Sequence, residues 1–276
     1  MKKIKCPLIV SDFDGTLLRS DGTIAPETRR AIAEYIEAGG KFALCTGRMT
    51  DSLLLQAKDL GLKGLAAGYQ GSSIVDIETG KVLVDGGLLA EEAAEICKLL
   101  EEDNLHIHLY LSDGFYSNMD DDALHLYEKI TGVCGKVLQK PASEFVLERK
   151  EKVKKVLAMV HAKDRSWVYS KAQERLGDKY YITYSSAHLV EILSKNYTKG
   201  TAVKLIADYY GIPVENTISV GDCYNDLPLL SAAGRGIAVK NADEELKKVF
   251  GAFAYSNDEN AIGKIIEEYG FYREEE

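Results

Sequence analysis

The sequence has little of what a membrane or secreted protein needs. None of its apolar runs approaches the ~18 consecutive residues that suggest a membrane span. The basic N-terminus reaches Pro7, Asp12 and Asp14 too soon to contain the apolar segment of a signal peptide. We therefore expect neither a signal peptide nor a membrane partner.

Cysteine is also sparse, with five residues in a chain of 276. No two of them are spaced as C-x-x-C, and an odd number in a chain of this length does not resemble a disulfide framework. They are Cys6, Cys45, Cys97, Cys134 and Cys223. This pattern indicates a reducing setting, and we expect a cytoplasmic protein.

Positive charge is in deficit, because 34 Lys and Arg residues face 43 Asp and Glu residues and leave a net charge of -9. Surfaces that bind nucleic acid or anionic membranes generally need the opposite balance, so neither partner is expected. An anionic substrate would have to be attracted by a few local groups. Nothing in the sequence indicates the oligomeric state.

Both ends of the chain alternate strands with helices. In the first part, predicted strands run into Asp12 and over Lys41–Cys45 and Leu65–Ala67, with helices from Pro26 and through Leu53–Leu60 between them. In the last part, the predicted elements are a helix through Ala202–Tyr209, strands at Thr217–Val220, Gly236–Val239 and near Ala252–Ala254, helices through Leu229–Ala233, Leu246–Phe250 and Ala261–Tyr269, and a solvated tail at Arg273–Glu276. This order is typical of a parallel sheet with right-handed crossovers, in which ligands bind at the carboxyl ends of the strands.

The middle of the chain has a different pattern, in which helices alternate with paired strands. A hairpin is predicted at Ser73–Ile77 and Val82–Asp85, followed by helices at Glu91–Glu102, Asp121–Ile130 and Asp164–Leu176 and by strands at Leu105–Leu111, Phe115–Asn118, Val153–Ala162, Tyr180–Tyr184 and Leu189–Leu193. We expect an α/β fold: a Rossmann-like, doubly wound parallel-sheet core over residues 1–86 and 194–276, with an α+β domain inserted at residues 87–193.

One strand of the insert has an apolar and a polar face. Within Leu105–Leu111 the odd positions are aliphatic, whereas the even positions are His106, His108 and Tyr110. The polar face is then either open above a neighbouring site or simply solvated, and the sequence does not decide between these readings.

Asp12 and Asp14 lie where the first strand runs into a turn that Gly15 permits. Side chains alternate in an extended segment, so the two carboxylates should project to the same side. Two like charges held together need a proton or a cation, and Mg²⁺ prefers such oxygen ligands. The alternative is a polar turn that only ends the strand.

Three further groups of polar residues occur at the same predicted edge of the sheet. Their backbone N–H groups, hydroxyl and ammonium could bind an anion, and their carboxylates could complete a metal site. They are Thr46 with Gly47, Lys199 with Gly200, and Asp222 with Asn225 and Asp226. An anion and a divalent cation in one cleft, with a carboxylate nucleophile, are the requirements of phosphoryl transfer.

Each of these residues has an ordinary structural explanation when it is taken alone. Thr46, Asp222 and Asp226 are all suited to cap a helix. Lys199 could be a surface lysine, with Lys195 as a competitor that lacks the following glycine. Arg48 could either contact a substrate or pair with an acidic neighbour.

Together, the motifs D-x-D-G-T, T-G-R, K-G and G-D-x-x-N-D occur in the order that resembles the haloacid dehalogenase (HAD) phosphatase superfamily. The insert lies between the second and third motifs, which resembles the Cof-type branch with its α/β cap. The resemblance implies that residues 87–193 form a cap that determines substrate specificity.

The resemblance also implies roles for individual residues. Asp12 would be the nucleophile that forms an aspartyl-phosphate and would bind Mg²⁺ through one oxygen. Asp14 would protonate the leaving oxygen, activate the hydrolytic water, and bind the metal through its backbone carbonyl. Thr46 and Lys199 would hold the phosphoryl oxygens, with help from the Gly47 N–H.

The resemblance implies two further metal-binding residues after the predicted strand Thr217–Val220. Asp222 would be a direct ligand of Mg²⁺, and Asp226 would orient that shell or bind through water. Asn225 would contact the phosphate or the metal shell.

Two departures from the family pattern concern the substrate. Gln70-Gly71 stands where Cof-type sequences commonly have an Asn-Gly pair that lines the pocket. Near the C-terminus, Asn260-Ala261 stands where an Asp-Gly pair is common. The candidate pocket residues are Arg48, Gln70, Gly71, His106 and His108.

The sequence therefore predicts a Mg²⁺-dependent phosphatase that acts on a small phosphorylated metabolite, such as a sugar phosphate or a similar phosphomonoester. One alternative is a phosphomutase that resembles phosphomannomutase. The other is a non-catalytic protein that binds a phosphorylated metabolite, although such a protein would be expected to have lost Asp12 or Asp14.

Overall fold

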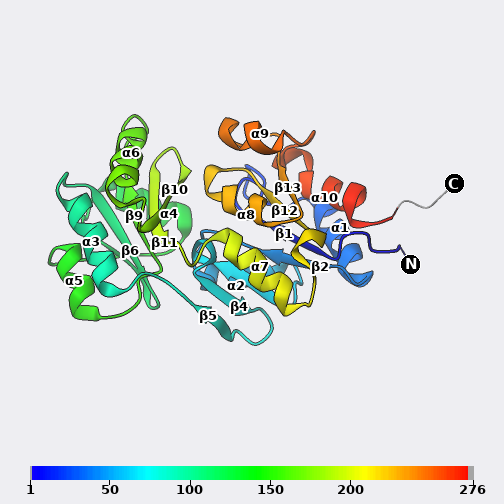
Figure 1. Cartoon of the computed structure of the whole chain (residues 1–276), viewed down its shortest axis with the longest axis horizontal. Coiled ribbons are helices and arrows are strands. Elements are labelled where there is room, and N and C mark those ends of the chain that lie inside the picture. Colours follow the sequence, from blue (N-terminus) through cyan, green and yellow to red (C-terminus); the bar gives the residue numbers. More distant parts are fainter. Residues whose placement is uncertain (1, 273–276) are drawn as a thin grey trace. The chain divides into compact units, whose positions relative to one another are not determined.

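A computed structural model describes residues 2–272 of the chain. It divides into two compact units (Figure 1): the first comprises Met1–Asp85 and Thr198–Glu276, and the second comprises Gly86–Tyr197. Each unit has a hydrophobic core of its own. The chain leaves the first unit once and returns to it once.

The centre of the first unit is a parallel four-stranded sheet with the order β13-β12-β1-β2. Its strands are β1 (Leu8–Ser11), β2 (Lys41–Leu44), β12 (Thr217–Gly221) and β13 (Arg235–Ala238). Ser11 is level with Leu44 on one side and with Val220 on the other. The carboxyl ends of these three strands therefore lie at one edge, which confirms the predicted α/β sheet and brings the residues that follow each strand together.

A second, antiparallel sheet continues from β2. It contains β3 (Leu65–Gly68), β4 (Ser73–Asp76) and β5 (Val82–Asp85), and a parallel bridge between Cys45 and Ala67 joins it to the main sheet. The strand near Leu65 and the hairpin after it are thus confirmed.

Six α-helices accompany these sheets in the described part of the first unit. They are α1 (Pro26–Glu37), α2 (Thr50–Asp59), α7 (Lys199–Tyr209), α8 (Leu227–Ala232), α9 (Glu244–Phe250) and α10 (Ala261–Ile265), which continues into a π-helical turn at Ile266–Gly270. Helix α1 begins at Pro26 because proline suits the first turn, where its missing N–H is not needed. Helix α7 is capped by Thr198, whose side chain accepts a hydrogen bond from Thr201 N.

One predicted element of the first unit is wrong. Residues 252–254 form no strand: Phe253 N donates to Ala238 O and Lys240 N donates to Tyr255 O, but no ladder follows. A strand needs a continuing register, which these isolated bonds do not supply. The tail predicted at Arg273–Glu276 lies outside the described residues.

The second unit is built on a six-stranded sheet with the order β10-β11-β9-β6-β7-β8, antiparallel except for the β7–β8 pair. The strands are β6 (His106–Leu111), β7 (Gly114–Ser117), β8 (Lys136–Val137), β9 (Lys155–Met159), β10 (Tyr180–Ser186) and β11 (Leu189–Ser194). The helices are α3 (Ala90–Glu101), α4 (Asp122–Thr131), α5 (Ala142–Arg149) and α6 (Arg165–Leu176). The sequence prediction missed β8 and α5 and made β9 too long.

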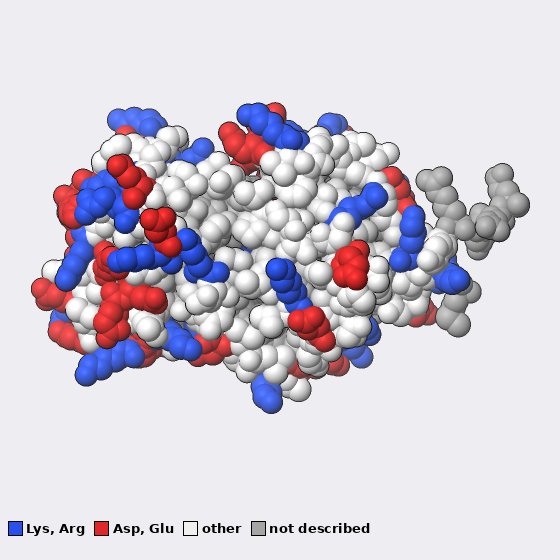
Figure 2. Space-filling view, in the orientation of Figure 1, with Lys and Arg blue, Asp and Glu red and all other residues white. Residues whose placement is uncertain are grey.

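The apolar face of this sheet packs against α3, α5 and α6. On the face of the second unit that Figure 2 shows, Lys and Arg side chains alternate with Asp and Glu side chains and do not gather into a basic patch. None of the helices within residues 2–272 is long and apolar enough to cross a membrane.

Candidate active site

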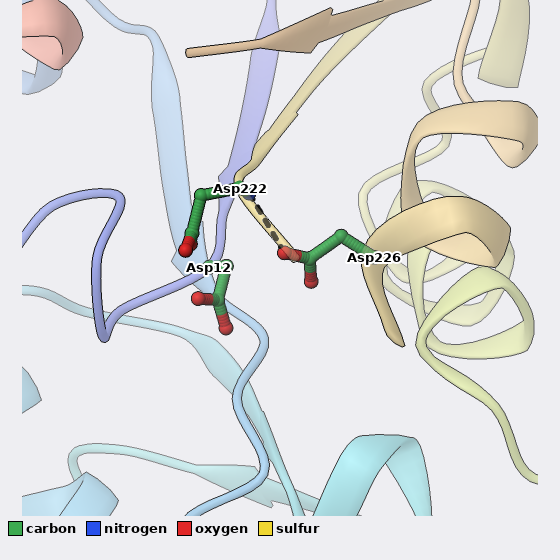
Figure 3. A group of neighbouring side chains, drawn as sticks. All are labelled: Asp12, Asp222 and Asp226. Atoms are coloured by element: carbon green, nitrogen blue, oxygen red, sulfur yellow. Dashed lines mark hydrogen bonds between the residues drawn. The ribbon is translucent and has the colours of Figure 1, made fainter. Parts of the chain in front are cut away.

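Three carboxylates meet at the carboxyl edge of the parallel sheet in the first unit. Asp12 follows β1, Asp222 follows β12, and Asp226 lies in the turn before α8 (Figure 3). One oxygen from each lies within 4.8 Å of the others. The order of the strands produces this cluster, because β1 and β12 are neighbours in register although more than 200 residues separate them in the chain.

Lys199 is the cation buried within this cluster. Its Nζ lies 2.6 Å from Asp12 Oδ1 and 2.5 Å from Asp226 Oδ1, and its side chain is 1% exposed. Lys195, the competitor in the sequence, donates instead to the backbone carbonyl of Asp178. Lys199 reaches the cluster because it is the first residue of α7.

The charges of this cluster are not balanced. Burial, reinforced by the charge of Asp226, raises the pKa of Asp12 well above its usual range and raises that of Asp222 to about 7. Burial alone would lower the pKa of Lys199, but Asp12 and Asp226 outweigh it and raise that pKa. Three carboxylates against one ammonium leave room for a divalent cation, and an all-oxygen ligand set suits Mg²⁺.

Asp226 differs from the other two carboxylates in its hydrogen-bond partners. Besides its contact with Lys199, it accepts hydrogen bonds from the backbone N–H groups of Asp222 at 2.9 Å and Cys223 at 3.2 Å. Because Asp226 is fully buried and its oxygens are already engaged, it is suited to hold Lys199 and the turn. Asp12 and Asp222 are better placed to bind a metal directly.

Sequence reasoning assigned no role to Thr16, although it belongs to the D-x-D-G-T motif. Thr16 Oγ1 donates to Asp222 Oδ1 at 2.6 Å, so it orients this carboxylate. The preceding Gly15 has φ +76°, and a Cβ there would lie 2.5 Å from Asp222 Oδ2. Glycine is therefore required where the loop after β1 passes Asp222.

Asp14 lies outside the cluster of three carboxylates. Its side chain is half exposed and binds Arg48, whose Nε and Nη2 donate to the two carboxylate oxygens at 2.8 and 2.7 Å. Strand alternation does not govern Asp12 and Asp14, because β1 ends at Ser11. The two aspartates consequently have different partners and different burial.

Thr46 and Gly47 lie at the same edge, after β2. The backbone of Thr46 is fixed on both sides: its N–H donates to Ala67 O, and its carbonyl accepts from Gln70 N, each at 2.9 Å. The Thr46 side chain is buried, and its Oγ1 accepts from Arg48 N at 3.2 Å. This loop is therefore rigid where an anion would be held.

Gln70 and Asn225 join this loop through their amides. Asn225 Nδ2 donates to Gln70 Oε1 at 3.2 Å, and a Cβ at Gly47 would lie 2.6 Å from Gln70 Nε2. Gln70 adopts a left-handed backbone conformation with φ +60°, which is strained for a residue with a side chain and is characteristic of functional sites. Gly71 also has a positive φ, and a Cβ there would collide with the carbonyl of Thr198.

His106 and His108 lie in the second unit, and the prediction of an open or solvated face there is wrong. Both are buried. The rings of Phe115 in β7 and Tyr127 in α4 pack against His108, with centroids 4.8 and 5.0 Å away, and His106 Nε2 lies 2.7 Å from Ser117 Oγ. Burial lowers the pKa of His108 to about 3. Whether either histidine contacts a substrate stays a prediction.

Comparison with known proteins agrees with this site. Residues 9–266 match the family described as haloacid dehalogenase-like hydrolase. The chain belongs to this family. It is a Cof-type member of the family and an enzyme of the HAD phosphatase type.

Two relatives and two solved structures illustrate the similarity of this HAD phosphatase to known proteins. It is 32% identical to the 5-amino-6-(5-phospho-D-ribitylamino)uracil phosphatase YwtE of Bacillus subtilis, over 96% of this chain and 98% of that protein, and 26% identical to the B. subtilis phosphatase YwpJ, over 94% and 98%. The crystal structure of TM0651 from Thermotoga maritima matches with a TM-score of 0.78 at 25% identity, over 97% of this chain and 98% of that chain. A haloacid dehalogenase-like hydrolase from B. subtilis shares the fold with a TM-score of 0.84 at 24% identity, over 95% and 99%.

Proposed function

We propose that this HAD phosphatase is Mg²⁺-dependent and hydrolyses a small phosphorylated metabolite through an aspartyl-phosphate intermediate. The observation that carries the proposal is the buried Asp12 carboxylate, which lies 2.6 Å from Lys199 Nζ and has an oxygen within 4.8 Å of one from Asp222. A carboxylate can attack a phosphate dianion only when the repulsion between them is offset. Lys199 and a bound divalent cation would offset it.

In the first half of the reaction, an oxygen of Asp12 attacks the phosphorus. The bond from phosphorus to the oxygen of the leaving group breaks, and that oxygen takes the proton of Asp14. Thr46, Lys199 and the Gly47 N–H hold the phosphoryl oxygens meanwhile, and the rigid loop after β2 supports this assignment.

In the second half, a water molecule attacks the phosphorus of the aspartyl-phosphate. Asp14 accepts the proton of the water, and the bond between Asp12 and phosphorus breaks to release inorganic phosphate. Asp14 thus returns to its protonated state, and the Asp12 carboxylate is regenerated.

Mg²⁺ would be held by the carboxylates of Asp12 and Asp222 and by the backbone carbonyl of Asp14, and when bound it supplies charge neutralisation at the phosphoryl group. Asp226 would orient this shell through its bonds to the Asp222 and Cys223 N–H groups. Asn225 would contact the phosphate or the metal shell.

Residues 87–193, which lie within the second unit, are proposed as the cap that recognises the leaving group. Arg48, Gln70 and Gly71 are proposed to line the substrate pocket. We propose 5-amino-6-(5-phospho-D-ribitylamino)uracil as the first substrate to test, because the relatives YwtE and YitU, 32% and 25% identical, are both named for it. A cytoplasmic location is proposed because all five cysteines are free.

The decisive test is the Asp12→Asn variant. We expect it to abolish Mg²⁺-dependent hydrolysis of para-nitrophenyl phosphate and the labelling of the protein by a phosphorylated substrate, while circular dichroism stays unchanged. Asp21→Asn is the matched control, because Asp21 is an exposed aspartate that bonds Thr23 on the surface of the same unit. Activity retained in Asp12→Asn would refute the nucleophile, and a screen of phosphorylated metabolites at saturating Mg²⁺ would identify the substrate.

A further inference from the structure

We propose that Arg48 is the residue that positions Asp14 for proton transfer, an inference that rests on the proposed function. Arg48 Nε donates to Asp14 Oδ2 at 2.8 Å, and Nη2 donates to Oδ1 at 2.7 Å. Two parallel contacts fix the plane of a carboxylate, which the single contact of an ammonium group does not do. Asp14 therefore has a defined orientation although half of its side chain is exposed.

Phe13 supports the arginine from a second direction. The guanidinium carbon of Arg48 lies 4.7 Å from the centroid of the Phe13 ring, and Phe13 is 1% exposed. Because Phe13 separates Asp12 from Asp14 in the chain, the segment that carries both carboxylates also carries the surface on which the guanidinium rests. Stacking on an aromatic face is a contact that arginine makes well.

The backbone of Arg48 is tied to the loop proposed to hold the phosphate. Its N–H donates to Thr46 Oγ1 at 3.2 Å, and its carbonyl accepts from Tyr69 N at 2.8 Å. Arg48 thereby fixes the orientation of Asp14 relative to the loop that would hold the phosphoryl oxygens. Proton transfer requires such an alignment of the acid with the leaving oxygen.

The Asp14–Arg48 pair has little to contribute to folding. Its side chains are 51% and 32% exposed, and exposed ion pairs add little stability. Arg48 makes two hydrogen bonds to Asp14, rests on the Phe13 ring and has a fixed backbone. These contacts are therefore better explained as a means of orienting Asp14 than as a source of folding stability. Arg48 would act through Asp14 and is a positioning residue in this proposal.

The first half of the reaction allows a kinetic measurement that reports specifically on Asp14 as the proton donor. As the bond between Asp12 and phosphorus forms and the bond to the leaving oxygen breaks, that oxygen takes the proton of Asp14, and the two contacts with Arg48 stabilise the carboxylate that is left. An alkoxide leaving group needs this proton, whereas para-nitrophenolate leaves readily without it. The value of kcat/KM reports the steps up to the departure of the leaving group, so a misplaced acid should affect alkyl phosphates selectively.

The experiment compares Arg48→Ala with the wild type on an alkyl phosphate and on para-nitrophenyl phosphate. We expect kcat/KM to fall about 10- to 100-fold for the alkyl phosphate and less than about threefold for the aryl phosphate, because positioned acid catalysis contributes roughly 10²–10⁴-fold. Asp14→Asn should show the same selectivity, and the double variant should lose little more than Asp14→Asn alone. Arg48→Lys should lie between Arg48→Ala and the wild type.

Arg29→Ala is the matched control, because Arg29 makes a comparable pair with Asp59 on the surface of the same unit at 2.7 Å. It should leave both kcat/KM values unchanged. Circular dichroism and thermal unfolding will verify that each variant is folded, and Arg48→Lys provides a second test if Arg48→Ala is not.

Two results would overturn the proposal. Equal losses for both substrates, with weaker inhibition by inorganic phosphate, would make Arg48 a phosphate ligand. Unchanged kinetics for both substrates would leave it without a role in the reaction. Failure of the proposed function itself is distinguishable, because it would appear as activity retained in Asp12→Asn whatever Arg48→Ala does.

Discussion

In the second unit, the buried Lys155 ammonium lies 2.7 Å from the carboxylate of Glu191, and both side chains are at most 5% exposed. In the first unit, the buried Lys199 ammonium faces two carboxylates, and the Asp222 carboxylate completes a cluster of three within 4.8 Å. One pair of charges is balanced and the other group has an excess of negative charge. A buried charge without a counterion is costly, so the second arrangement favours a ligand-binding role over a purely structural one.

The histidines extend the comparison. His108 is as deeply buried as Asp12, but its position between Phe115 and Tyr127 keeps it neutral, because burial lowers its pKa to about 3. In the second unit the Lys155–Glu191 pair is thus balanced and His108 is neutral, whereas the carboxylate cluster of the first unit has an excess of negative charge.

Breaking the Lys155–Glu191 pair should give the largest change in the free energy of unfolding. Glu191→Gln leaves the Lys155 ammonium buried without its carboxylate, and we expect the free energy of unfolding to fall by about 3–5 kcal/mol. Trp167, the only tryptophan of the chain, belongs to α6 of the second unit, so its fluorescence during chemical denaturation reports on this unit.

Glu148→Gln is the control for this variant, because the Lys140–Glu148 pair has side chains that are 38% and 61% exposed. Exposed pairs contribute about 0–1 kcal/mol, so this change should be small. Replacement of both Lys155 and Glu191 by apolar residues should recover stability. Equal effects of Glu191→Gln and Glu148→Gln would contradict a structural role for the buried pair.

A divalent cation should supply the positive charge that the carboxylate cluster of the first unit lacks. At a Mg²⁺ concentration about 100 times the dissociation constant, we expect a gain of about 2.7 kcal/mol in the free energy of unfolding, measured by calorimetry. Excess EDTA should abolish both this gain and the hydrolysis of aryl phosphate. Asp222→Asn should lose most of the Mg²⁺-dependent gain, whereas Glu191→Gln should keep it; full turnover in EDTA would count against the metal.

The pH dependence of stability should carry the opposite sign from that of an ordinary salt bridge. The pKa of Asp222 is raised to about 7, and that of Asp12 is also raised, by burial and by Asp226. Between pH about 4 and 7 the folded protein therefore binds more protons than the unfolded chain, so the metal-free protein should lose stability as the pH rises through this range.

Thermal unfolding in EDTA across this range measures the trend. Because Mg²⁺ competes with protons for the same carboxylates, its affinity should increase over the same range of pH. Stability that rose with pH in the metal-free protein would show that the carboxylates are not destabilised in the folded state.

The smallest effect is expected at His108. Since its ring is neutral, ring nitrogen shifts measured by NMR between pH 5 and 8 should show no titration of this residue. Removing its contact with His106, where the two Nε2 atoms lie 3.1 Å apart, by His108→Phe should cost about 1 kcal/mol. A titration near neutral pH would mean that the second unit also contains an unbalanced charge.

Much of the fold follows from patterns that neighbouring residues create. The alternation of strands and helices predicted the parallel sheet, and Pro26 marked the first turn of α1. The strand β8 was missed because two residues carry little periodic signal. The helix α5 was also missed, although the shorter helices α8, α9 and α10 were predicted. The absent strand at residues 252–254 shows that an apolar segment forms a ladder only where a partner strand continues in register.

The sequence by itself determined which residue types were available for the site. The four motifs predicted Asp12, Lys199, Asp222 and Asp226 as site residues, because carboxylates that follow buried strands and a lysine that opens a helix together indicate a site for a metal and an anion. The tertiary structure decided what each group contacts: Asp226 binds Lys199, Thr16 binds Asp222, and Asp14 binds Arg48. Such pairings depend on chain segments 27 to 206 residues apart, and only the packing of the sheet brings those segments together.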